Sequence, residues 1–91
     1  MDKSIYTHEY AVLLRLLRAH REKHGFTQKE MAAKLGVTQS TYSKLERGDR
    51  RIDVIQLRTI TISIGIDFLK FAQELEQEIR KGEKPSKRST R

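Results

Sequence analysis

The chain has 91 residues, a formal net charge of +7 and no cysteine. A chain of this length forms one small domain and buries only about 60–65% of its unfolded surface. The lack of cysteine excludes a disulfide scaffold and a cysteine-ligated zinc site, and it predicts a reducing cytoplasm as the location. The sequence has neither the ~20 apolar residues of a membrane span nor the apolar segment of a secretory signal.

The positive charge is distributed unevenly. Residues 80–91 carry a net +5 and the other 79 residues only +2. The excess favours a polyanionic partner, but most of it lies in a polar segment, 82–91, that we predict to be a disordered basic tail. Such a tail is either a solvated terminus, which we favour, or an arm that follows a nucleic-acid backbone. The predicted organisation is an N-terminal arm (1–8), a folded domain (9–81) and this tail (82–91).

Glycines divide the folded part into five segments with helical periodicity. Each of the five glycines, at positions 25, 36, 48, 65 and 82, follows such a segment, where the left-handed conformation that ends a helix favours glycine. We therefore predict an all-α fold of five short helices. The first, about Glu9–Lys23, carries an apolar stripe that contains Leu13 and Leu17.

The second and third helices begin at threonines. Thr27 and Glu30 form a capping box at the start of a helix that ends near Leu35, because each side chain can bond the backbone amide of the other. After the turn at Gly36, Thr38 can cap a third helix that extends to about residue 47. Two short helices joined by a glycine turn predict a helix-turn-helix from residue 27 to residue 45.

The fourth segment, about Val54–Ile64 after an Asp53 cap, is ambiguous. Residues 59–64 alternate between Ser/Thr and isoleucine, which is typical of a strand. Leu57, Ile60 and Ile64 instead have helical spacing, and no second alternating segment is present to pair with a strand. We therefore predict a helix.

The fifth helix, Asp67–Lys81, has an apolar seam. Phe68, Ala72, Leu75 and Ile79 lie at seam positions, with Phe71 beside them. The seam can pack on the first helix or contact a second chain, and it can do both at once. We favour a dimer contact, because the seam exceeds what one thin core can cover.

The third helix presents a polar face near its N-terminus. Gln39, Ser40, Ser43 and Lys44 lie on one side of it. A helix that enters the major groove of DNA presents its N-terminal residues to the bases. Glutamine can bond adenine, lysine can bond guanine, and serine can bond either. The spacing therefore predicts a helix that reads the major groove.

From Leu13 to Leu69 the chain resembles the Cro/lambda-repressor-like helix-turn-helix family, also called the xenobiotic-response-element type. The matching residues are Leu17, Arg18, Arg21, Gly25, Phe26, Thr27, Gln28, Ala32, Leu35, Gly36, Val37, Gln39, Ser40, Thr41, Ser43, Lys44, Glu46, Arg47, Gly48, Leu57, Gly65, Phe68 and Leu69. The resemblance covers about two thirds of the chain. It implies a compact five-helix fold that binds double-stranded DNA, usually as a dimer on a palindrome.

The resemblance also implies roles for individual residues. The predicted base-contacting residues are Gln39, Ser40, Ser43 and Lys44, and the predicted phosphate-contacting residues are Gln28, Thr38, Thr41, Arg47, Arg50 and Arg51. Gln28 is also expected to brace Gln39, while Arg21 and Glu46 match a structural salt bridge of the family.

The chain departs from the family pattern in two places. Tyr42 replaces an aliphatic residue, so its hydroxyl needs a partner or an exposed edge. Ile60-Thr61-Ile62 leaves surplus apolar surface on the fourth helix, which often marks an interface. The predicted dimer interface consists of Val54, Ile62, Phe68, Phe71, Ala72, Leu75 and Ile79.

Two functions remain open at this stage. The first is a homodimeric transcriptional repressor that occludes a promoter, and the second is an antitoxin that also binds a toxin protein. No motif predicts an enzyme, and we expect no cofactor. His20 and His24 have the spacing of a metal pair, but no third ligand is evident, and the negative end of the helix dipole explains them more simply.

Overall fold

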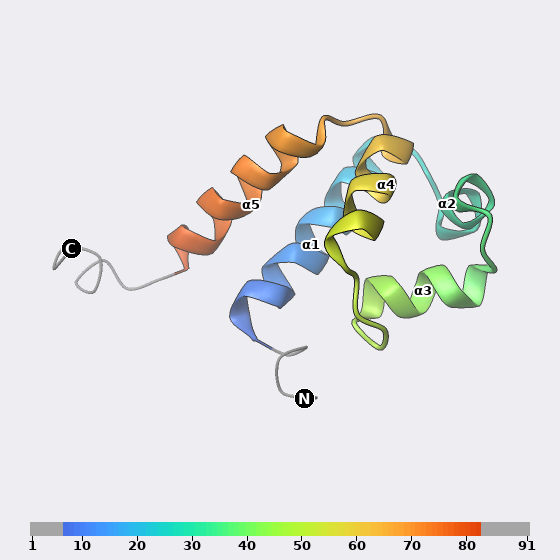
Figure 1. The fold of residues 1–91 in the computed structure, drawn as a ribbon, viewed down its shortest axis with the longest axis horizontal. Coiled ribbons are helices and arrows are strands. Elements are labelled where there is room, and N and C mark those ends of the chain that lie inside the picture. The colour runs from blue at the N-terminus through green and yellow to red at the C-terminus, as the bar shows by residue number, and fades with distance from the viewer. Residues whose placement is uncertain (1–6, 83–91) are drawn as a thin grey trace, which may run out of the picture.

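Five helices follow one another in a computed structural model that describes residues 7–82 (Figure 1). They are α1 (His8–Lys23), α2 (Gln28–Leu35), α3 (Gln39–Arg47), α4 (Val54–Ile64) and α5 (Phe68–Lys81), and the described residues form no strand. The predicted all-α class is confirmed, including helix rather than strand for residues 59–64. His8, which was assigned to the N-terminal arm, already belongs to α1. The predicted tail, apart from Gly82, lies outside the described residues.

Side-chain caps start the helices as the sequence predicts. The Thr27 hydroxyl accepts from the Glu30 amide at 3.0 Å, and the Glu30 carboxylate accepts from the Thr27 amide at 2.9 Å. Asp53 caps α4, and the side chain of Gln56 completes a second capping box there. Each cap satisfies backbone amides that lack a partner in the first turn of a helix, which explains why the helix starts were predictable within one residue.

Glycine ends the helices by the expected mechanism at four of the five positions. Gly36, at the turn between α2 and α3, has φ 73°, and Gly25, Gly48 and Gly65 also have positive φ. Gly82 does not, because its φ of −85° continues the right-handed conformation of α5. A β-carbon at Gly82 would overlap the ring of His8, an exposed side chain at the start of α1 that would have to move aside.

Each helix buries at least one side chain completely. The largest of these are Leu17, Met31, Tyr42, Ile60, Thr61 and Phe71. In Figure 1, α1 and α5 lie side by side and run in opposite directions, while α2 and α3 stand together at the other end of the long axis. The pair α2 and α3 and the C-terminal end of α5 are therefore far apart.

Phe71 corrects the predicted dimer interface. Its ring is only 2% exposed, and Phe68 and Leu75 also pack against the core. The inner side of the seam thus belongs to the core of this chain, so Phe71 is not available to a partner.

Within residues 7–82, no helix is long and apolar enough to cross a membrane.

Candidate nucleic-acid interface

The N-terminal half of α3 presents a polar face to solvent. Gln39, Ser40 and Lys44 are exposed, and Ser43 is half-buried and accepts from the Arg47 guanidinium at 3.3 Å. On the opposite side of α3, Tyr42 and Leu45 are buried. The helix is therefore amphipathic in the sense that groove reading requires, with its apolar side against the domain and its polar side free.

Thr38 and Thr41 organise the first turn of α3. The Thr38 hydroxyl accepts from the Thr41 amide at 3.1 Å and lies 3.0 Å from the Thr41 hydroxyl, to which it donates. The two hydroxyls that were predicted to contact phosphate thus lie together at the positive end of the α3 dipole, where an anion is favoured.

The arginines at the end of α3 lie in different environments. Arg47 bonds Asp49 twice, at 2.9 and 2.7 Å, and both side chains are at least half exposed. The loop that follows is held by Lys44, whose carbonyl oxygen accepts from the amides of Asp49 and Arg50. Arg50 and Arg51 are exposed in this loop.

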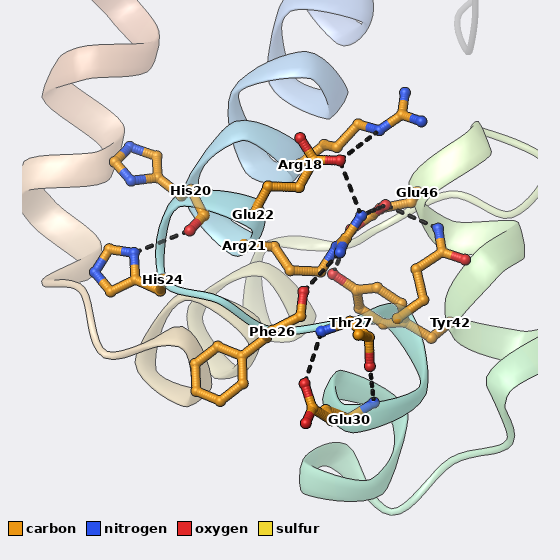
Figure 2. Close-up of polar contacts among 11 residues, drawn as sticks. Arg18, His20, Arg21, Glu22, His24, Phe26, Thr27, Glu30, Tyr42 and Glu46 are labelled. Carbon is orange, nitrogen blue, oxygen red and sulfur yellow. Dashed lines mark hydrogen bonds and ion pairs between the residues drawn. The ribbon is translucent and has the colours of Figure 1, made fainter.

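Beneath the polar face, the carboxylate of Glu46 joins the first three helices (Figure 2). Arg21 of α1 donates to it at 2.6 and 3.1 Å, and Tyr42 of α3 donates at 2.8 Å. Gln28 of α2 donates through its amide nitrogen at 3.0 Å. Arg21 also reaches the carbonyl of Phe26 at 2.7 Å. We call Arg21, Gln28, Tyr42 and Glu46 the Glu46 network; because it links three helices, it fixes how α3 sits on the domain.

The network perturbs the acidity of its members. Burial would raise the pKa of Glu46, but the hydrogen bonds from Arg21, Gln28 and Tyr42 outweigh it and lower that pKa below its ordinary value. The hydrogen bond to Glu46 raises the pKa of Arg21. Burial and the neighbouring carboxylate both raise the pKa of Tyr42. Glu46 is therefore a buried anion stabilised by three donors.

Comparison with known proteins gives an independent view of the same region. A helix-turn-helix family model matches residues 17–71. An XRE-family like protein from Pseudomonas syringae is 42% identical and superposes with a TM-score of 0.77, covering 84% of this chain and 93% of that one.

The control protein C.MunI of a Mycoplasma species is 27% identical over 64 residues, which span 70% of this chain and 86% of that protein. The HTH-type transcriptional regulator YqaF of Bacillus subtilis is 30% identical over 70 residues, spanning 77% of this chain and 92% of that protein.

The chain belongs to the XRE/Cro-like helix-turn-helix family of DNA-binding transcription regulators. The family resemblance predicted from the residues is confirmed. The matched region contains α2, α3 and α4, and it includes every member of the Glu46 network. In this helix-turn-helix protein the predicted salt bridge between Arg21 and Glu46 is present.

Sequence reasoning did not find the other bonds of the network. Gln28 was expected to brace Gln39, but its amide is bonded to Glu46. The partner of the Tyr42 hydroxyl was left open, although Tyr42 and Glu46 are four residues apart on a helix, a spacing at which side chains meet. That spacing was the signal available in the sequence.

The two histidines of the helix-turn-helix domain have separate partners. His20 Nε2 lies 2.7 Å from a carboxylate oxygen of Glu74 in α5. His24 Nδ1 lies 2.9 Å from the carbonyl oxygen of His20 (Figure 2). Residues 7–82 contain no group of three or more His, Cys, Asp or Glu side chains able to hold a metal ion. The pair instead ties α5 to α1 and caps the end of α1.

Proposed function

We propose that this protein is a homodimeric repressor that binds a palindromic operator with one α3 in the major groove of each half-site. The observation that carries the proposal is the exposed face of Gln39, Ser40 and Lys44 on a helix that the Glu46 network holds in place. A reading helix must be rigid, because a base contact is specific only when its donor and acceptor are held in position.

The exposed face has the chemistry of direct readout. Gln39 suits the N6 and N7 positions of adenine, and Lys44 suits O6 or N7 of guanine. Ser40, in the first turn, and Ser43 can each donate to or accept from a base edge. Together they support sequence-specific recognition rather than charge-driven binding alone.

The surrounding residues support contact with the DNA backbone. Gln28, Thr38 and Thr41 stand at the first turns of α2 and α3, where the helix dipoles favour phosphate. Arg47, Arg50 and Arg51 follow at the other end of α3. The Arg47–Asp49 pair is exposed and contributes at most about 1 kcal/mol, so Arg47 can exchange Asp49 for a phosphate at low cost.

Two copies are needed to read a palindrome. The half-sites would lie one helical turn apart, ~10 base pairs from centre to centre. The Mycoplasma relative is named a control protein, which supports a regulator of this compact type. The simplest mechanism for one small domain is occlusion of a promoter, carried out at the nucleoid in the cytoplasm.

Selection of binding sites from random DNA with the purified full-length protein tests the proposal. We expect a palindrome to emerge. Gln39→Ala and Lys44→Ala should each relax the preference at particular base pairs and weaken specific binding by about 1–3 kcal/mol.

The control comes from the end of α1, where Lys23 is also exposed. Lys23→Ala should leave the selected sequence unchanged. If Gln39→Ala and Lys44→Ala also left it unchanged, α3 would not be the reading helix.

A further inference from the structure

The largest exposed apolar side chains outside the helix-turn-helix lie on α4 and on the first turn of α5. Val54, Ile55, Ile62 and Leu69 are 63%, 68%, 51% and 70% exposed. When several large aliphatic side chains are exposed together on a small domain, they indicate a surface that another molecule covers in the functional protein. We call these four residues, with Arg58, the α4 patch.

Helical spacing places the members of the patch on one face of α4. Ile55 and Ile62 are seven residues apart, so they are separated by two turns on the same side, and Arg58 lies between them. The buried side chains of α4, among them Leu57 and Ile60, occupy the opposite face. The patch is therefore a continuous outward stripe.

Leu69 extends this stripe onto α5 as a ridge between two hollows. One hollow is lined by Arg58, Ile62, Asp67 and Phe68 together with Leu69. The other runs along α5 past Ala72 toward Arg80. A ridge beside a hollow is the shape that two copies related by a two-fold axis can share, because the ridge of each fills the hollow of the other.

The hollow also carries opposite charges. The guanidinium of Arg58 has no hydrogen bond or ion pair within residues 7–82, although the Arg58 carbonyl accepts from the Thr61 hydroxyl. One carboxylate oxygen of Asp67 caps α5 by accepting from the Lys70 amide. A two-fold contact would bring the Arg58 guanidinium of each copy to Asp67 of the other. A surface with both signs of charge is thus complementary to itself.

We propose that the α4 patch is the interface through which two copies of this chain associate. This inference rests on the proposed homodimer and specifies its contact surface. It keeps Val54 and Ile62 of the predicted interface and adds Ile55, Arg58 and Leu69. It leaves out the inner side of the α5 seam, which is already covered by the chain's own core.

The spacing of half-sites on DNA agrees with this location. The two α3 helices must lie about 34 Å apart to enter successive major grooves. Figure 1 shows α3 and the C-terminal end of α5 toward opposite ends of the described residues, with α4 between them. A contact through α4 would therefore bring the two α3 helices closer together than a contact at the far end of α5 would.

The oligomeric state of the full-length protein provides the first test. Sedimentation equilibrium over a concentration series should show a monomer–dimer equilibrium. Ile62→Glu should raise the dimer dissociation constant roughly tenfold or more, because it would place a charge in a desolvated contact. Ala19→Glu, an exposed position on α1, should leave the dissociation constant unchanged.

The natural absence of cysteine permits a positional test. Ile62→Cys and Leu69→Cys, prepared separately and then mixed under mild oxidation, should form a cross-linked pair. Leu69→Cys mixed with Ala19→Cys should not.

The charge pair can be tested with a double-mutant cycle. Arg58→Glu should weaken the dimer by like-charge repulsion with Asp67. Asp67→Asn in that background should restore part of the affinity, since asparagine keeps the helix cap but removes the charge.

The outcomes separate this inference from the proposed function. A dimer that persists in Ile62→Glu and gives no cross-link would overturn the α4 interface and leave the homodimer standing. A chain that stays monomeric at every concentration, with and without its DNA site, would overturn both the α4 interface and the homodimer. The same holds if a different protein, rather than a second copy, covers the α4 patch.

Discussion

Glu46 joins α1, α2 and α3 through directional bonds to a buried carboxylate, whereas α5 is attached to α1 mainly through the buried ring of Phe71. The ion pairs between α1 and α5, Arg15–Glu78 and His20–Glu74, are partly exposed. The proposed reading helix, α3, is thus fixed in orientation by hydrogen bonds. The attachment of α5 is less directional and leaves its outer surface exposed.

The comparison predicts that the two ends fail for different reasons. At the α3 end, a substitution that removes a charge but keeps the size of the side chain should greatly lower the free energy of unfolding. At the α5 end, a loss of side-chain volume should lower it greatly, and a loss of charge only slightly.

The largest effect is expected from Glu46→Gln. Arg21 would then be a buried cation without its counter-ion, and breaking a buried ion pair in this way costs about 3–5 kcal/mol of unfolding free energy. Chemical denaturation measures the loss. Glu76→Gln removes an exposed ion pair to Arg80 and should cost no more than about 0.5 kcal/mol. Similar losses in the two variants would contradict the central role of the Glu46 network.

Phe71→Ala should destabilise the protein by about 3 kcal/mol, because it empties the contact between α5 and the core. The control is Leu69→Ala two residues earlier, where the side chain is largely exposed and the monomer should lose at most about 0.5 kcal/mol. Thermal unfolding at low protein concentration, where the proposed dimer would be dissociated, compares the two. Equal losses would mean that α5 is attached by a different face.

The smallest effect is expected from Tyr42→Phe, about 1.5 kcal/mol, because Glu46 keeps its bonds to Arg21 and Gln28. The pH dependence of unfolding should show what the hydroxyl does. The pKa of Tyr42 is raised in the folded state above its ordinary value of 10.0, so its contribution is present below pH 10.0 and is lost as pH rises above it. Tyr42→Phe should lack this alkaline loss.

The acid limb of the same curve reports on Glu46. Its pKa is lowered in the folded state, so its contribution is present above the ordinary value of 4.5 and is lost as pH falls below it. Tyr42→Phe should retain this acid loss, while Glu46→Gln should reduce it. A variant that changed both limbs alike would show that the two groups do not act separately.

Much of the candidate site was predictable because it is local. The polar face of α3 follows from helical spacing, and the position of α3 follows from Thr38 and Gly36 on either side of the turn. The partners of these residues were less predictable. Gln28 donates to Glu46, 18 residues further along the chain, and not to Gln39. Arg47 donates to Asp49. Neither contact follows from helical periodicity.

The sequence by itself determined the helices and their ends, since caps and left-handed glycines act within about four residues of one another. The tertiary structure alone decided what the apolar side of α5 packs against. Helical spacing separates Phe71 from Leu69, but it left open whether Phe71 meets the first helix or a second chain, and the structure buries Phe71 in the chain's own core. That choice depends on where α1 and α4 lie against α5, and contacts between segments far apart in the chain are fixed only when all of them pack together.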